Sequence, residues 1–187
     1  MIGAAAPAAT GYRASLMDVD ELLGLLATGR RVFDEPNVDA LAHALQCGAI
    51  LRTEQPHDLE LAVAGLVHDI SDVADPTDHR DHDRRGAALV EPLLGARVAK
   101  LVGAHVVAKR YLVATEPAYR SQLSVRSLET LAAQGDVLDD RALAEMRADP
   151  ELDAILALRR ADERAKDPSA QVAGLDTWRP IIERVAR

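Results

Sequence analysis

Four of the six histidines in the sequence, together with two aspartates, form an ordered series whose side chains can bind metal. The members are His43, the pair His68-Asp69, His82, His105 and Asp162. Imidazole and carboxylate groups together suit iron, zinc and manganese. His68 and Asp69 close the most apolar predicted helix, where a buried polar pair is costly unless something compensates its charge. The joint occurrence of these residues, in order and on elements that can converge, predicts a metal cage.

Each member of the series also has a simpler interpretation when taken alone. A single His43 on an amphipathic helix is more often a satisfied core histidine than a ligand. His82 would fit a loop surface, and His105 would fit a contact between helices. Asp162 would fit the solvated face of a charged helix. Only the complete set favours metal binding.

The elements that must position these residues are predicted to be helices, because aromatic residues make up only 3% of the chain and give strands little to build on. Helical patterns and caps predict the following segments. The first three are a helix capped by Asp18 and running to about Ala27, one that starts at Asn37 as its N-cap, and one from about Leu59 to Asp69. Two helices follow over Asp83–Leu94 and Ala96–Lys109, with a break near Gly95. The last three are one capped by Ser124 and ending before Gly135, one from Asp149-Pro150 to Lys166, and a short one after Asp176. A loop is expected from Ser71 to Asp81. The expected fold is a single all-α helical bundle around a dinuclear metal site.

Length and charge limit the range of functions. With 187 residues and a formal net charge of -8, the chain is the size of one domain and too acidic for a nucleic-acid partner to be expected. No apolar run approaches the ~20 residues that a bilayer requires, and residues 1–12 are expected to form a loose N-terminal arm rather than a signal peptide. We therefore expect a cytoplasmic protein with no membrane partner. Cys47 is the single cysteine, which excludes a disulfide within the chain and favours a packed thiol.

The order of these ligands is the signature of the HD-domain superfamily, and several segments resemble one branch of it more closely. These are His43-Ala-Leu-Gln-Cys, Gly65-Leu-Val-His-Asp, His82-Asp-Arg-Arg-Gly-Ala, His105-Val-Val-Ala-Lys-Arg-Tyr-Leu-Val and Leu158-Arg-Arg-Ala-Asp-Glu-Arg-Ala-Lys166. They are similar to the mixed-valence diiron oxygenases that cleave organophosphonates, typified by 2-amino-1-hydroxyethylphosphonate dioxygenase. The likeness extends from about Val38 to the C-terminus, so residues 13–187 are interpreted as one HD domain.

The resemblance implies two iron ions, Fe2+ and Fe3+, with O2 as co-substrate. One iron would be held by residues matching His43, His68, Asp69 and Asp162, and the other by His82 and His105, with Asp69 bridging the two. The catalytic set would be Asp69, His82 and His105, because the second iron keeps open positions for the substrate. The implied reaction cleaves the carbon–phosphorus bond of a 1-hydroxyalkylphosphonate, a small organophosphonate, and releases phosphate and a carboxylic acid.

The resemblance also implies a pocket for the phosphonate. Lys109 lies four residues after His105, which places both on one helical face. Arg159 is expected to reach the phosphonate, while Ser127 and Thr130 match hydroxyl groups that hydrogen-bond it. Charge-assisted hydrogen bonds from lysine and arginine are an efficient way to hold such a dianion.

The departures from the family pattern fall on the substrate side of the site. Phe33 stands where family members have a tyrosine, and Glu35 is offset from the glutamate that accompanies it. Asp72 replaces a histidine three positions after Asp69, and the loop before His82 is shorter. We therefore expect an intact cage and a different substrate, in which a cationic group would meet Asp72.

Two other functions remain open at the level of sequence. The first is an HD-type metal-dependent phosphohydrolase that acts on a phosphate ester or nucleotide. The second is a degenerate HD module kept for binding or regulation, against which the complete ligand set argues.

Overall fold

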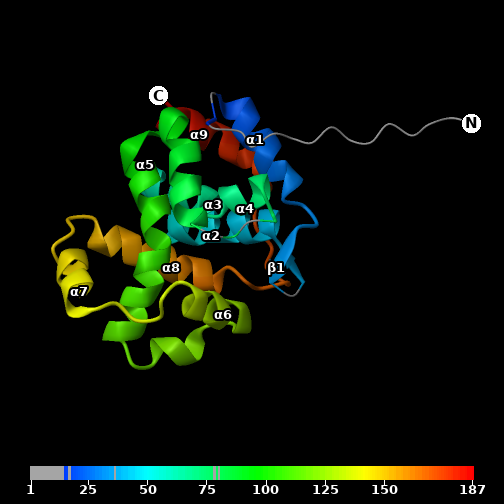
Figure 1. The fold of residues 1–187 in the computed structure, drawn as a ribbon. Helices are drawn as coiled ribbons and strands as arrows, with labels where there is room; N and C mark the ends of the chain where they lie inside the picture. Colours follow the sequence, from blue (N-terminus) through cyan, green and yellow to red (C-terminus); the bar gives the residue numbers. More distant parts are fainter. Residues whose placement is uncertain (1–14, 17, 36, 78, 80) are drawn as a thin grey trace, which may run out of the picture.

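The helices of the chain have the following bounds in a computed structural model that describes residues 15–16, 18–35, 37–77, 79 and 81–187. They are α1 (Val19–Thr28), α2 (Ala40–Glu54), α3 (Leu59–Val67), α4 (Ile70–Ala74), α5 (His82–Thr115), α6 (Val125–Ala133), α7 (Asp140–Arg147), α8 (Leu152–Arg164) and α9 (Arg179–Val185). Two short 3-10 helices are also present: η1 (Tyr119–Gln122) lies between α5 and α6, and η2 (Leu175–Trp178) lies between α8 and α9. The mostly helical structure confirms the predicted all-α class (Figure 1). The predicted arm at residues 1–12 lies outside the described residues.

Local capping explains where several helices begin. The Asp18 carboxylate accepts a hydrogen bond of 2.8 Å from the amide of Glu21, and the Ser124 hydroxyl accepts one of 3.0 Å from the amide of Ser127. Both caps were predicted. Asn37 as the cap of α2 was wrong, because Asp39 takes that place and Asn37 lies in a turn with a φ of 64°. Asparagine tolerates this left-handed conformation better than most residues.

A two-stranded antiparallel hairpin precedes α2, formed by β1 (Phe33–Glu35) and β2 (Val38–Asp39). The prediction contained no strand here, and the strands are too short to show an alternating pattern. The loop predicted from Ser71 to Asp81 was wrong in its first part, which belongs to α4. Helix α7 was also missed, although Asp139 caps it with a hydrogen bond of 2.8 Å to the amide of Ala142.

Helix α5 changes direction at Gly95, where the predicted break is found. Gly95 has a φ of 83°, a conformation that glycine adopts without a steric penalty. A Cβ atom there would also meet the guanidinium of Arg187. Beyond the bend, α5 continues to Thr115 and carries His105 and Lys109 (Figure 1).

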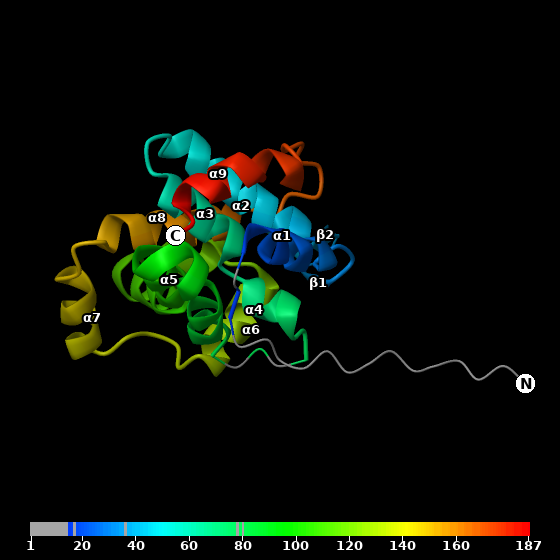
Figure 2. The same cartoon turned by 90° about the horizontal axis from the view of Figure 1, so that it is seen from above.

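The hydrophobic core surrounds α3, which is apolar on nearly all sides as predicted. All its residues from Leu61 to Val67 are buried, and it packs against α2, α5, α8 and α9 (Figure 2). His68 and Asp69 directly follow its last turn, so their side chains extend from the core. Within the part of the chain that the structure describes, no helix is both long and apolar enough to cross a membrane.

Candidate metal centre

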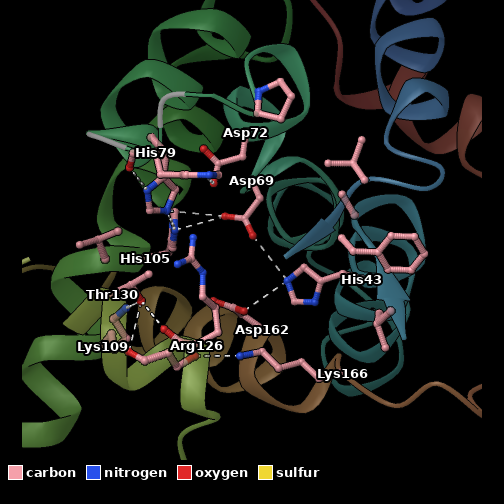
Figure 3. A pocket seen from close by; sticks show the side chains of 18 of the residues that line it. His43, Asp69, Asp72, His79, His105, Lys109, Arg126, Thr130, Asp162 and Lys166 are labelled. Carbon is pink, nitrogen blue, oxygen red and sulfur yellow. Dashed lines mark hydrogen bonds and ion pairs between the residues drawn. The ribbon is translucent and has the colours of Figure 1, made fainter. Parts of the chain in front are cut away.

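The six predicted ligands come together from five helices or their ends. Figure 3 labels four of them: His43, Asp69, His105 and Asp162. His43 lies in α2, His68 and Asp69 lie between α3 and α4, His82 begins α5, His105 follows its bend, and Asp162 lies in α8. The four helices α2, α3, α5 and α8 pack against one another around the core, so the fold itself gathers these side chains.

The first cluster contains His43, His68, Asp69 and Asp162. The Nε2 atoms of His43 and His68 are 3.2 Å apart. Oδ2 of Asp69 lies 3.6 Å from Nε2 of His43 and 3.2 Å from Nε2 of His68. Oδ1 of Asp162 lies 3.3 Å and 3.7 Å from the same two nitrogens. Two imidazoles and two carboxylates thus face one small volume.

The second cluster contains His82, His105 and the other oxygen of Asp69. The Nε2 atoms of the two histidines are 2.9 Å apart. Oδ1 of Asp69 lies 3.7 Å from His82 Nε2 and 3.5 Å from His105 Nε2. Asp69 therefore presents one oxygen to each cluster, which is the arrangement of a carboxylate that spans two cations.

The other ring nitrogen of each histidine is held by a main-chain carbonyl. The Nδ1 distances are 2.8 Å from His43 to Ala165 O, 2.8 Å from His68 to Gly65 O, 2.7 Å from His105 to Val102 O and 3.2 Å from His82 to His79 O. A carbonyl only accepts, so each Nδ1 donates, and in the neutral ring each Nε2 turns a lone pair toward the centre. Facing lone pairs at these distances repel unless a cation lies between them, and this orientation is typical of metal-bound histidine. The donor set fits two cations.

Electrostatics around the centre favour the protonation states that metal binding requires at His105 and Asp162. Burial, together with the neighbouring His82, lowers the pKa of His105 to about 3. Burial opposes ionisation of Asp162, but Arg159 and His68 outweigh it and hold the pKa of Asp162 well below its usual range. Burial also opposes a charge on His68, yet Asp69 raises its pKa well above the usual value. The carboxylates therefore favour positive charge at this point.

A cavity of about 180 Å³ opens beside the two clusters. The four residues expected to contact the phosphonate line it together with Asp72: Lys109, Ser127, Thr130 and Arg159. The Nζ atom of Lys109 donates a hydrogen bond of 2.7 Å to Thr130 Oγ1. Burial, reinforced by the nearby charge of Arg159, lowers the pKa of Lys109 to about 8. The cavity thus places a buried ammonium close to the second cluster.

Arg159 is more fully engaged with the protein than the sequence suggested. Its guanidinium donates to the carboxylates of Asp162 and Glu163, and its Nε donates a hydrogen bond of 2.9 Å to Tyr119 Oη. Its Nη2 also lies 3.4 Å from Ser127 Oγ. Arg159 therefore links the wall of the cavity to the Asp162 carboxylate of the first cluster.

Glu163 is the buried centre of this network, and sequence reasoning missed it. Besides Arg159, it accepts hydrogen bonds from the Ser127 hydroxyl at 2.9 Å, from Lys166 Nζ at 3.2 Å and from the amide of Ser124 at 2.7 Å. Its spacing from Arg159 and Lys166 on one helical face was the signal that could have identified it. Lys166 also donates to Ser127 Oγ at 2.8 Å and lines the cavity.

The residues that depart from the family pattern lie on the cavity wall as well. Oδ2 of Asp72 lies 3.3 Å from Nδ1 of His79, and burial together with Asp69 raises the pKa of Asp72. Phe33 also lines the cavity, whereas the side chain of Glu35 lies outside what the structure describes. Cys47 is a fully buried thiol in the core, and burial raises its pKa.

Comparison with known proteins identifies relatives that match most of the chain. The [1-hydroxy-2-(trimethylamino)ethyl]phosphonate dioxygenase (glycine-betaine-forming) of Leisingera caerulea is 32% identical over 76% of this chain and 76% of its own length. The hydroxymethylphosphonate dioxygenase of Gimesia maris is 30% identical over 88% of this chain and 86% of its own length. An uncharacterised protein of Acanthamoeba polyphaga mimivirus is 34% identical over 50% of this chain and 43% of its own. No protein-family model matches the chain.

Proposed function

The chain belongs to the phosphonate dioxygenases, and from this membership we propose that it uses two iron ions and O2 to cleave the carbon–phosphorus bond of a 1-hydroxyalkylphosphonate. The products would be hydrogen phosphate and the corresponding carboxylic acid as its carboxylate, with one proton released. The carbinol carbon is oxidised and O2 supplies the two additional oxygen atoms. The observation that carries the proposal is the single Asp69 carboxylate, with one oxygen toward each pair of facing imidazoles.

The proposed metal ligands divide between the two clusters. His43, His68 and Asp162 would hold one ion, His82 and His105 the other, and Asp69 would contact both. When bound, the iron pair supplies the electron transfer that couples reduction of O2 to oxidation of the substrate carbon. Because the second cluster offers fewer protein ligands, an ion held there would keep positions for oxygen atoms of the substrate.

The cavity wall would bind and orient the phosphonate. Lys109 lines the same cavity as His82 and His105 of the second cluster, and its ammonium donates to the Thr130 hydroxyl. Ser127 lines this cavity as well. Charged donors to phosphonate oxygens form hydrogen bonds about twice as strong as neutral ones. Arg159 supports the site by holding Asp162 and by lining the wall behind Ser127. A substrate bound against this wall would also exclude water from the carbon that is oxidised.

The relatives favour an oxygenase over a phosphohydrolase, and a single comparison tests this. Iron-loaded protein is mixed with a 1-hydroxyalkylphosphonate in air and, separately, without oxygen. We expect O2 consumption and phosphate release in about equal amounts in air, and no phosphate without oxygen. Phosphate released from a phosphate ester without oxygen, in the presence of manganese, would instead establish a phosphohydrolase. Asp69→Asn is the inactive control, and Asp153→Asn, on the exposed face of α8, is the matched control for the charge change.

A further inference from the structure

The two sides of the cavity carry opposite charge. In Figure 3, Lys109, Thr130 and Lys166 lie on one side of Asp69, and Asp72 and His79 lie on the other. A phosphonate held on the lysine side would therefore extend its carbon substituent toward Asp72. A second anionic group would be repelled there, whereas a cation would be attracted.

Asp72 lies about one helical turn after Asp69, since its amide donates a hydrogen bond of 3.0 Å to the carbonyl of Asp69. Its side chain is 21% exposed and faces the cavity. Oδ2 lies beside His79, while Oδ1 has no hydrogen-bond partner among the described residues. This carboxylate is thus only partly balanced by the protein around it.

Apolar side chains also line the cavity. Val32, Phe33, Val38 and Pro76 line the same cavity as Asp72. Phe33, the single phenylalanine of the chain, is 60% exposed and leaves its ring available to a ligand. Aromatic faces attract quaternary ammonium groups, whose methyl surface is apolar and whose charge is spread over it.

We propose that Asp72, Phe33 and the apolar residues that line the same cavity form a subsite for a methylated ammonium substituent of the substrate. A quaternary ammonium has no N–H group and needs no hydrogen-bond acceptors. One nearby carboxylate and an apolar wall are enough for it. A primary ammonium has three donors to satisfy, and the side chains of Phe33, Val32 and Val38 offer no acceptor for them. This subsite rests on the proposed function, because that function places the phosphonate at the lysine side.

Binding without oxygen tests the subsite apart from turnover. Isothermal titration calorimetry on the iron-loaded protein compares three ligands: [1-hydroxy-2-(trimethylamino)ethyl]phosphonate, its neutral isostere (1-hydroxy-3,3-dimethylbutyl)phosphonate, and hydroxymethylphosphonate. The first two have the same shape and differ in one positive charge. We expect the ammonium ligand to bind about tenfold more tightly than the isostere, as a partly desolvated charge pair and a cation–π contact would provide.

Two variants locate the effect. Asp72→Asn should reduce the preference for the ammonium ligand to about threefold or less, and Phe33→Leu should weaken ammonium binding while binding of hydroxymethylphosphonate stays unchanged. Asp153→Asn removes an equal charge from an exposed position and should leave all three affinities unchanged. Metal content and melting temperature of each variant are measured alongside, so that loss of the fold or of iron is recognised.

The outcomes separate the subsite from the proposed function. Equal affinity for the ammonium ligand and its isostere, or a preference that survives both variants, overturns the subsite. If phosphate is still released in air in that case, the proposed function stands. If no ligand binds and none yields phosphate, the two proposals fail together. The expected binding pattern without phosphate release in air supports the subsite and rejects the oxygenase.

Discussion

The Nδ1 atom of His43 in α2 donates a hydrogen bond of 2.8 Å to the carbonyl oxygen of Ala165, the residue that follows α8. The bond turns Nε2 of His43 toward Asp162, which lies in the last turn of the same helix. One contact therefore sets the direction of a proposed ligand and joins the two helices that carry ligands. Binding of metal at this point should stabilise the packing of α2 against α8.

Asp69→Asn should remove bound metal, because among the described residues Asp69 is the one whose carboxylate oxygens reach both clusters. We expect metal content, measured by elemental analysis, to fall from about two ions to well below one per chain. The melting temperature should fall by roughly 5–10 °C, as expected when a ligand present at about 100 times its dissociation constant is lost. Asp72→Asn makes the same chemical change three residues away and should keep its metal. Full metal content in Asp69→Asn would contradict the proposed cage.

Binding of the phosphonate should weaken as pH rises through the pKa of Lys109. Burial lowers that pKa to about 8, so the ammonium is present below about pH 8 and is lost above it. The pH profile of kcat/KM reports this group in the free enzyme. We expect a decrease of up to about tenfold per pH unit above the pKa. Lys109→Met, similar in size and uncharged, should bind weakly at every pH and lose this decrease. An unchanged decrease in the variant would assign it to another group.

Glu163→Gln should destabilise the protein through the side chains that it holds. Arg159, Lys166 and Ser127 all donate to this buried carboxylate. Its neutralisation leaves the buried Arg159 and the partly buried Lys166 less compensated, and breaking a buried ion pair costs about 3–5 kcal/mol of the free energy of unfolding. The measurement is unfolding in urea. As a control, Glu54→Gln breaks an exposed ion pair between Glu54 of α2 and Arg164 of α8, and it should cost about 0–1 kcal/mol. Similar values for the two variants would refute the central role of Glu163.

Arg97→Met should weaken the junction of α3, α5 and α8. The guanidinium of Arg97 bonds both oxygens of Asp58 at 2.7 Å and lies 3.0 Å and 3.1 Å from Glu151 and Glu60. Because Asp58 also caps α3, we expect a loss of about 1–3 kcal/mol in the free energy of unfolding. Arg141→Met, which removes an exposed pair within α7, serves as the neutral control. Equal stability of both variants in thermal unfolding would show that the cluster contributes nothing.

The predicted elements succeeded where their cause is local. Asp18 and Ser124 cap helices through amides three residues ahead, and Gly95 breaks α5 because its backbone adopts a positive φ. Such features depend on neighbouring residues, which a sequence displays directly. The prediction that Asn37 caps α2 was wrong because Asp39, two positions later, is also a favoured capping residue and takes that place. The hairpin before α2 had no local signal of its own.

The sequence by itself determined the kinds of side chain available for the centre and their order along helices: four histidines, Asp69 and Asp162. Their order along the predicted helices and the apolar character of α3 predicted that these side chains come together at the core. That they bind metal stays a prediction. Only the tertiary structure decided which nitrogen of each ring faces the centre, that Arg159 is engaged by Tyr119 and Glu163, and that Asp72 meets His79. These relationships depend on carbonyl oxygens and side chains far away in the sequence, whose positions follow from packing of the whole chain rather than from any local pattern.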